Sequence, residues 1–141
     1  MREAPKYNPR RQGDEGERSA LIWFMEHGCD VFVPIGHSPD IDMIAFYDGR
    51  YCGIQVKTTS HFRKGRWTPM IATKGGNQSW SGVAKYFDAT RCDYLFVVAG
   101  DGRRWLIPSD QVEGRHGLAL GGPKYSEFEV ERGRPLLHVV G

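Results

Sequence analysis

Four polar residues flank a predicted turn in the middle of this 141-residue chain. Asp40 and Asp42 stand at the start of one apolar run, and Gln55 and Lys57 lie within the next. Carboxylate and amide oxygens are ligands that Mg²⁺ accepts, and the ion keeps coordination sites for water and phosphate oxygens. An amine near such an ion can orient or deprotonate a water molecule. These residue types indicate metal-assisted hydrolysis, provided that the fold brings them together.

The two apolar runs are predicted to form a β-hairpin. Residues 41–47 and 50–59 are separated by Asp48-Gly49, a dipeptide preferred in two-residue type I′ turns. In that register Asp42 faces Gln55, and Asp40 faces Lys57. Partners across a hairpin, and residues two apart along a strand, share one face of the sheet. The hairpin would therefore gather the four polar side chains on one face.

The opposite face of the second strand carries Cys52, Ile54 and Val56, which suit a core. This assignment depends on the register, because a slip of one residue would turn Asp42 to the other face from Gln55. A solvated polar face is the alternative for Gln55 and Lys57 on an antiparallel sheet.

The other elements predict an α+β fold built on one mixed sheet with flanking helices. A helix is expected to begin at Asp14, with Glu17 three residues later as in a capping box, and to end at Gly28. A second hairpin is expected around Asp101-Gly102. Further strands are expected at residues 29–33, 66–73, 94–99 and 104–108, and short helices at residues 81–89 and 109–112. This order is typical of a mixed sheet with a few helices.

The length fits a single domain. Residues 1–13 are expected to form a flexible basic arm, followed by one domain over residues 14–141. Its core would span about residues 14–112, with a C-terminal extension over residues 113–141.

Positive charge is concentrated in one part of the sequence. Residues 49–87 contain seven Lys and Arg residues and no Asp or Glu, although the whole chain has a net charge of only +2. A field of one sign attracts a polyanion such as a nucleic acid. Aromatic side chains in the same segment, such as Phe62 and Trp67, could stack on bases.

Several protein classes do not fit the sequence. No apolar run approaches the roughly 20 residues of a membrane-spanning helix. The first 13 residues lack the apolar stretch of a secretory signal. Cys29, Cys52 and Cys92 are odd in number and have no C-x-x-C spacing, which argues against a disulfide framework or a cysteine-rich zinc site. We therefore expect a cytoplasmic protein with no membrane partner.

Taken in order, these residues resemble the PD-(D/E)XK nuclease superfamily. The resemblance rests on Glu17, on Pro39 to Ala45 with its Pro-Asp40 pair, and on Ile54 to Thr59. Gln55-Val56-Lys57 stands where the family usually has (D/E)-x-K. Glutamine at that place is similar to the group I intron-associated homing endonucleases, and the likeness covers about residues 14–112.

The resemblance implies an αβββαβ core and hydrolysis of DNA phosphodiester bonds that depends on Mg²⁺, with Mn²⁺ as a substitute. Carried over residue by residue, Glu17 would be an outer carboxylate of the metal site and Asp42 a metal ligand. Gln55 would be a ligand or a water-positioning amide, and the backbone carbonyl of Val56 a further ligand. Lys57 would be the amine that activates water.

The partners expected are double-stranded or branched DNA and further copies of this chain. A small subunit reads a short site and a duplex has two strands to cut, so we expect a homodimer or homotetramer. The residues expected to contact DNA are Arg10, Arg11, His61, Arg63, Lys64, Arg66 and Lys74.

Two other functions are compatible with the sequence. A Holliday-junction resolvase would use the same core and metal chemistry on branched DNA, although Gln55 argues against it because that family usually keeps glutamate. A non-catalytic DNA-binding module with a degenerate site would keep the positive charge without the chemistry.

Overall fold

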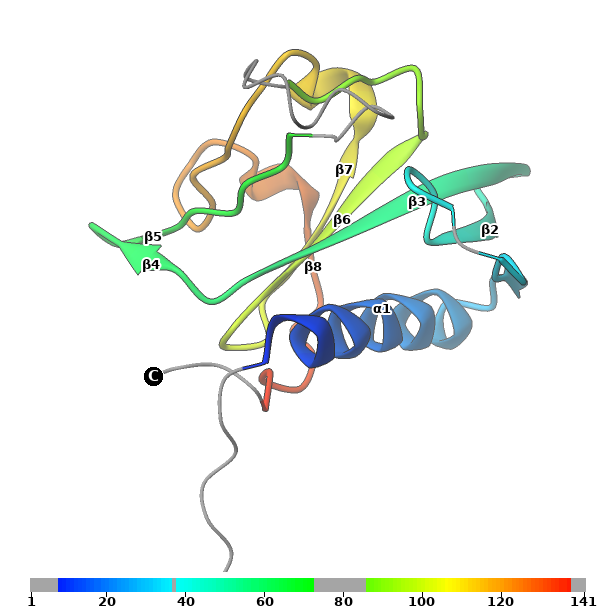
Figure 1. The fold of residues 1–141 in the computed structure, drawn as a ribbon, viewed down its shortest axis with the longest axis horizontal. Helices are drawn as coiled ribbons and strands as arrows, with labels where there is room; N and C mark the ends of the chain where they lie inside the picture. Colours follow the sequence, from blue (N-terminus) through cyan, green and yellow to red (C-terminus); the bar gives the residue numbers. More distant parts are fainter. Residues whose placement is uncertain (1–7, 37, 73–85, 138–141) are drawn as a thin grey trace, which may run out of the picture.

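A long helix lies across one face of a six-stranded sheet in the computed structural model, which describes residues 8–36, 38–72 and 86–137 (Figure 1). The sheet has the order β1-β2-β3-β6-β7-β8, in which only β3 and β6 are parallel. Its strands are β1 (Val31–Phe32), β2 (Met43–Tyr47), β3 (Arg50–Thr59), β6 (Tyr94–Ala99), β7 (Arg104–Pro108) and β8 (Glu129–Val130). A separate two-stranded hairpin joins β4 (Phe62–Arg63) to β5 (Arg66–Trp67). The expected α+β fold class is confirmed.

The β2–β3 hairpin has the predicted turn and register. Asp48 and Gly49 have φ angles of 52° and 82°, and positive values at both positions define a type I′ turn. Tyr47 pairs with Arg50, and the ladder runs back to Met43 opposite Ile54. The strand begins two residues later than expected, which leaves Asp40 and Asp42 beyond its paired part.

Helix α1 (Pro9–Glu26) begins five residues before the predicted start. The side chain of Asn8 accepts hydrogen bonds from the backbone N–H groups of Arg10 and Arg11, so Asn8 rather than Asp14 is the cap. Pro9 suits the first helical position because it has no N–H to satisfy. Residues 9–13 are therefore helical rather than part of an arm, and residues 1–7 lie outside the described residues. The helix ends at Glu26, and Gly28 follows its C-cap with a φ of 75°, as expected of the glycine that terminates it.

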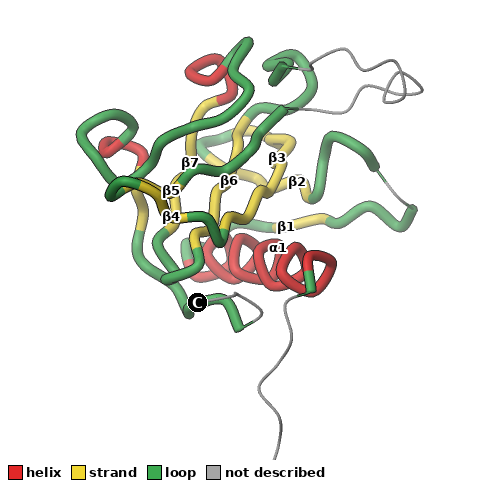
Figure 2. The backbone as a smooth tube through the Cα atoms, turned by 60° about the vertical axis from the view of Figure 1, so that its left-hand side comes forward, coloured by secondary structure: helices red, strands yellow, loops and turns green. Residues whose placement is uncertain are grey.

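Apolar side chains cover both faces of the sheet. One cluster, which includes Trp23, Phe24, Ile54 and Phe96, lies between α1 and the sheet. The other cluster contains residues of β6 and β7 that point the opposite way, among them Leu95, and is covered by the loops that follow β5 and η2 (Ser109–Val112) (Figure 2). Alternation along β3 therefore places Ile54 and Val56 on the helix side, and Gln55 on the other.

The remaining expectations have mixed outcomes. The second hairpin, β6–β7, and the helical turn η2 are confirmed. The strand expected at residues 66–73 ends at Trp67. Of the helix expected at residues 81–89, residues 81–85 lie outside the described residues, and residues 86–88 have no regular structure. The C-terminal extension supplies a short 3₁₀-helix, η3 (Ser126–Phe128), and the edge strand β8. No helix in the described ranges is long and apolar enough to cross a membrane.

Candidate active site

Strand β3 changes its neighbour at Ile54. Its first half pairs with β2 as far as Ile54, and its second half pairs with β6 from Ile54 to Thr59. Beyond Ile54, no described strand pairs with the edge of β3 that faced β2. The sheet therefore forks at this point and leaves polar backbone groups of β3 at an open edge.

Asp42 lies at the fork and binds both strands. Its backbone N–H donates to the carbonyl of Ile54 at 2.8 Å, and its carboxylate accepts from the N–H of Val56 at 2.7 Å. The N–H and C=O of one strand residue point toward the same edge of the sheet. The Val56 carbonyl therefore points toward the open edge where the Asp42 carboxylate lies, as a shared ligand set would require.

Gln55 is buried next to this edge with its amide oxygen unsatisfied. The side chain is only 4% exposed, and within the described residues its Oε1 has no hydrogen-bond partner. An unsatisfied buried acceptor costs about 1–3 kcal/mol. A cation bound by Oε1 would remove that cost, so this orphaned oxygen fits a metal ligand.

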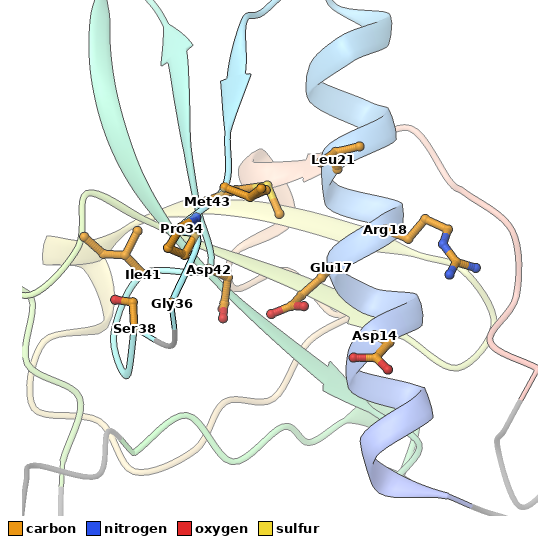
Figure 3. A pocket seen from close by; sticks show the side chains of 11 residues that line it. Asp14, Glu17, Arg18, Leu21, Pro34, Gly36, Ser38, Ile41, Asp42 and Met43 are labelled. Carbon is orange, nitrogen blue, oxygen red and sulfur yellow. The ribbon is translucent and has the colours of Figure 1, made fainter.

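Glu17 reaches the same place from α1. A cleft of about 460 Å³ separates α1 from the segment before β2, and Glu17 and Asp42 point toward each other across it (Figure 3). Burial, the hydrogen bond with Asp42 and the charges of Asp42 and Asp14 together raise the pKa of Glu17 to about 7, with burial as the largest cause. The Glu17 carboxyl can therefore hold a proton near neutral pH. A divalent cation between Glu17 and Asp42 would replace that proton.

Close packing of α1 on β3 sets the position of Glu17. A Cβ atom at Gly16 would overlap the methyl group of Thr58, so only glycine allows this approach. One helical turn earlier, the Gln12 side chain donates to the Thr58 hydroxyl at 3.1 Å. Glu17 follows Gly16 directly, so the helix holds its side chain at the mouth of the fork.

Lys57 is half-buried two residues after Gln55 on β3. Residues two apart along a strand share a face, so Lys57 and Gln55 lie on the same side of the sheet, as expected. Lys57 pairs in register with Val97 of β6. The strand that supplies the amide oxygen therefore also supplies the amine.

Asp40 does not join these residues opposite Lys57, and that part of the prediction is wrong. The β2–β3 ladder stops at Met43, so the pairing does not extend to Asp40. Its carboxylate instead forms an ion pair with Arg91 at 2.9 Å. This pair ties the segment before β2 to the segment before β6, which gives Asp40 a positioning role for Asp42.

Sequence reasoning also missed Asp93. Its carboxylate accepts from the Gly53 N–H at 2.7 Å, and its own N–H donates to the Gly53 carbonyl at 2.8 Å. Arg91 and Asp93 were not assigned to the site because their partners lie about 40 or more residues away in the sequence. No local pattern marks such contacts.

The cations expected to contact DNA fall on two elements. His61, Arg63 and Lys64 are exposed at the end of β3 and in the β4–β5 hairpin, and Arg66 is half-buried there. The exposed residues Arg10 and Arg11 lie in the first turn of α1, where positive charge is unfavourable because the helix dipole is positive at that end. Lys74 lies outside the described residues.

A metal ion here would need ligands beyond acids. Within the described ranges, no three His, Cys, Asp or Glu side chains are grouped closely enough to hold a metal. Two carboxylates are present at the fork, and the Gln55 amide and the Val56 carbonyl would complete an all-oxygen set. Such a set suits Mg²⁺ rather than zinc.

No family model matches the chain, and no curated protein matches its sequence. Among solved structures, the chain is similar to a bacterial homing endonuclease, I-Ssp6803I, with a TM-score of 0.65 and 14% identity. The match covers 87% of this chain and 87% of that one. Likeness at this identity shows a shared fold, and it supports the nuclease fold expected from the motifs.

Proposed function

We propose that this protein is a DNA endonuclease of the homing type that hydrolyses phosphodiester bonds with Mg²⁺. The observation that carries the proposal is the fork at Ile54, where the Asp42 carboxylate accepts from the Val56 N–H at the open edge of β3 and the amide oxygen of the preceding residue, Gln55, is buried without a partner in the described residues. The fold shared with a homing endonuclease supports it independently of these contacts. The Gln-x-Lys motif supports the PD-(D/E)XK assignment and its intron-associated branch.

Each residue at the fork has a distinct role in the proposal. Asp42, the Gln55 Oε1 and the Val56 carbonyl hold the cation, and Glu17 is the outer carboxylate. The bound ion supplies a Lewis acid for the scissile phosphate, and Mn²⁺ has the same ligand preference. Lys57 orients the attacking water and offsets negative charge that develops on the phosphate. The water oxygen bonds to phosphorus as a bridging P–O bond breaks.

Positive residues around the fork would hold the DNA backbone. Arg10 and Arg11 begin the helix whose second turn packs on Thr58, so they lie near the end of β3 and the hairpin that follows it. Their unfavourable place at the helix N-terminus is understandable if they bind phosphate. Contacts of this kind position a duplex without reading its sequence.

One fork can cut one strand, so cleavage of a duplex needs two copies. We propose a homodimer, or a dimer of dimers, with two forks related by a two-fold axis. The mass in solution, measured by sedimentation with and without duplex DNA, checks this, and a monomer on cleaved duplex would contradict it.

Cleavage assays on the full chain test the function. The parent should nick linear duplex DNA with Mg²⁺ and not with EDTA, and Lys57→Ala should slow nicking about 100-fold or more while DNA affinity stays within a few-fold. Lys124→Ala is the matched control, because Lys124 is an exposed lysine that lies over the Tyr125 ring. It should leave cutting unchanged.

Three outcomes contradict the proposal. Paired nicks in a four-way junction, with linear duplex intact, would indicate a resolvase. DNA binding without any Mg²⁺-dependent nicking by the parent would indicate a non-catalytic module. Equal rates for the parent and Lys57→Ala would remove Lys57 from the chemistry.

A further inference from the structure

The β4–β5 hairpin presents cations on a narrow ribbon outside the main sheet (Figure 1). Lys64 and Gly65 form its turn with φ angles of 51° and 77°, again a type I′ turn. Arg63 and Lys64 are exposed, and Phe62 is 55% exposed although it is a large apolar side chain. Nothing in the sequence from residue 49 to residue 87 supplies a carboxylate to neutralise this charge.

The base of the hairpin is fixed, which leaves only its tip for a partner. Trp67 and Leu120 exchange two backbone hydrogen bonds at 2.9 and 2.8 Å, and the Trp67 ring packs against the apolar cluster on the face opposite α1. The Arg66 guanidinium lies against Gly122, where a Cβ would overlap it. Thr68 N–H donates to the His61 carbonyl at 3.0 Å and closes the ribbon.

A two-stranded ribbon of this kind has the width of one DNA groove. Its strands lie roughly 5 Å apart and carry side chains on both sides, which fits a major groove about 12 Å wide and not a minor groove of about 6 Å. An arginine fork in the major groove bonds guanine O6 and N7, and its fixed planar geometry makes this contact more specific than that of a flexible lysine. An exposed phenyl ring can contact the thymine methyl group.

We propose that the β4–β5 hairpin enters the major groove and that Arg63 reads a guanine there, with Lys64 at the turn on phosphate. This inference rests on the proposed function, since it assigns the sequence preference of the same enzyme. In the proposed function, the positive residues only hold the DNA backbone. Here Arg63 instead determines sequence specificity, and Lys64 keeps a phosphate contact.

The reading element and the fork belong to one continuous segment. Arg63 follows Lys57 by six residues, so their Cα atoms are at most about 20 Å apart. One turn of B-DNA spans about 34 Å. With the lengths of the two side chains added, the guanine that Arg63 reads lies within about one helical turn of the phosphate that is cut.

Selection from a pool of randomised duplexes tests the inference. Lys57→Ala, which should bind DNA without cutting it, is used as the parent for binding, and bound duplexes are recovered and sequenced. Lys57→Ala should enrich duplexes that carry one guanine within about one helical turn of the cleavage position. The cleavage position is mapped with the unsubstituted protein, which cuts DNA. Adding Arg63→Ala, which removes every donor that could bond guanine O6 and N7, should lower that preference about tenfold or more.

Two further variants separate reading from charge. Lys64→Asn removes the charge, and asparagine tolerates the positive φ of the turn. It should keep the guanine preference, weaken binding to all duplexes, and reduce the slope of log affinity against log salt by about one. Arg134→Ala, at an exposed arginine of the C-terminal segment beside α1, is the matched control and should leave the guanine preference unchanged.

A substituted base locates the contact in the groove. Replacing the selected guanine by 7-deazaguanine removes the N7 acceptor, and it should weaken binding when Arg63 is present and not after Arg63→Ala. An unchanged guanine preference in Arg63→Ala, or no effect of 7-deazaguanine, would overturn the hairpin proposal. Absence of Mg²⁺-dependent cutting, with the preference intact, would reject the nuclease and leave the reading element standing.

Discussion

Two aspartates make the same kind of contact with β3, close to the residue where its paired strand changes from β2 to β6. Asp93 accepts the Gly53 N–H on the edge that faces β6, and Asp42 accepts the Val56 N–H on the opposite edge, each at 2.7 Å. In both places a carboxylate satisfies a backbone donor where one neighbouring strand has ended. The local geometry alone does not distinguish them.

The surroundings of Asp42 and Asp93 differ in charge. Asp93 lies 3.4 Å from the Arg50 guanidinium, so a cation of the protein balances its charge. Asp42 instead faces the carboxyl group of Glu17 across a cleft (Figure 3). Bringing two carboxyl groups together opposes folding, which is typical of a site shaped for a ligand. The difference assigns chemistry to the Asp42 side of β3 and structure to the Asp93 side.

The same substitution at both aspartates should separate these roles most strongly. Asn keeps an oxygen that can accept the backbone N–H and removes the negative charge. Asp42→Asn should slow Mg²⁺-dependent cutting about 100-fold or more without loss of stability, because it relieves repulsion with Glu17. Asp93→Asn should keep cutting within a few-fold and lose up to about 1 kcal/mol of stability with its exposed ion pair.

Nicking rates and urea midpoints measured on both variants check this prediction. A similar loss of cutting in both would mean that the two aspartates act together on the geometry of β3, and the contrast between the halves would fail.

A second pair of substitutions tests the packing that brings Glu17 to the fork. Gly16→Ala should destabilise the fold by about 1–3 kcal/mol and slow cutting, because the added methyl overlaps Thr58 and pushes α1 away from β3. Gly13→Ala is the matched control in the same helix, with nothing within 4 Å of the added Cβ. It should stabilise the fold by about 0.5–1 kcal/mol and leave cutting unchanged.

Adding Thr58→Ser to Gly16→Ala removes the overlapping methyl and should restore part of both losses. No rescue, with cutting still impaired, would show that Gly16 does not act through the distance between α1 and β3.

What could be predicted from the sequence followed from local chemistry. The Asp48-Gly49 turn set the register of the hairpin. That register brought Asp42 to β3, where it bonds Ile54 and Val56, and it placed Lys57 on the same face as Gln55. The helix start was wrong because Asn8-Pro9 is a stronger cap than Asp14, with both a side-chain acceptor and a residue without an N–H. The Asn8-Pro9 pair is visible in the sequence, but it lies within residues 1–13, which were expected to form a flexible arm.

Other features depend on contacts between distant segments. The parallel pairing of β3 with β6 decides where the sheet forks, and no turn specifies it. Asp40 could not be placed because its partner, Arg91, is remote in the sequence. Glu17 was selected through the order of family motifs rather than by periodicity, and its approach to Asp42 depends on the contact of Gly16 with Thr58.

The smallest expected effect concerns the pH dependence of stability without divalent ions. Glu17 has a pKa of about 7 in the fold against 4.5 for an ordinary glutamate, with burial as the largest cause. Between these values the folded state holds more protons than the unfolded state, so the free energy of unfolding falls as pH rises from about 4.5 to about 7. Glu17→Gln removes this titration. Because solvent screens the site, we expect the variant to gain about 1 kcal/mol over the parent at pH 8 and little at pH 5.

Urea unfolding in EDTA at the two pH values measures the difference. Adding Mg²⁺ at pH 8 should then stabilise the parent more than Glu17→Gln, because a cation bound only by the folded state favours it and the parent keeps the outer carboxylate. If the free energy of unfolding has the same pH dependence in the parent and in Glu17→Gln, the Glu17 carboxyl does not cause the loss of stability as pH rises. The difference between the two sides of β3 would then have to depend on Asp42 alone.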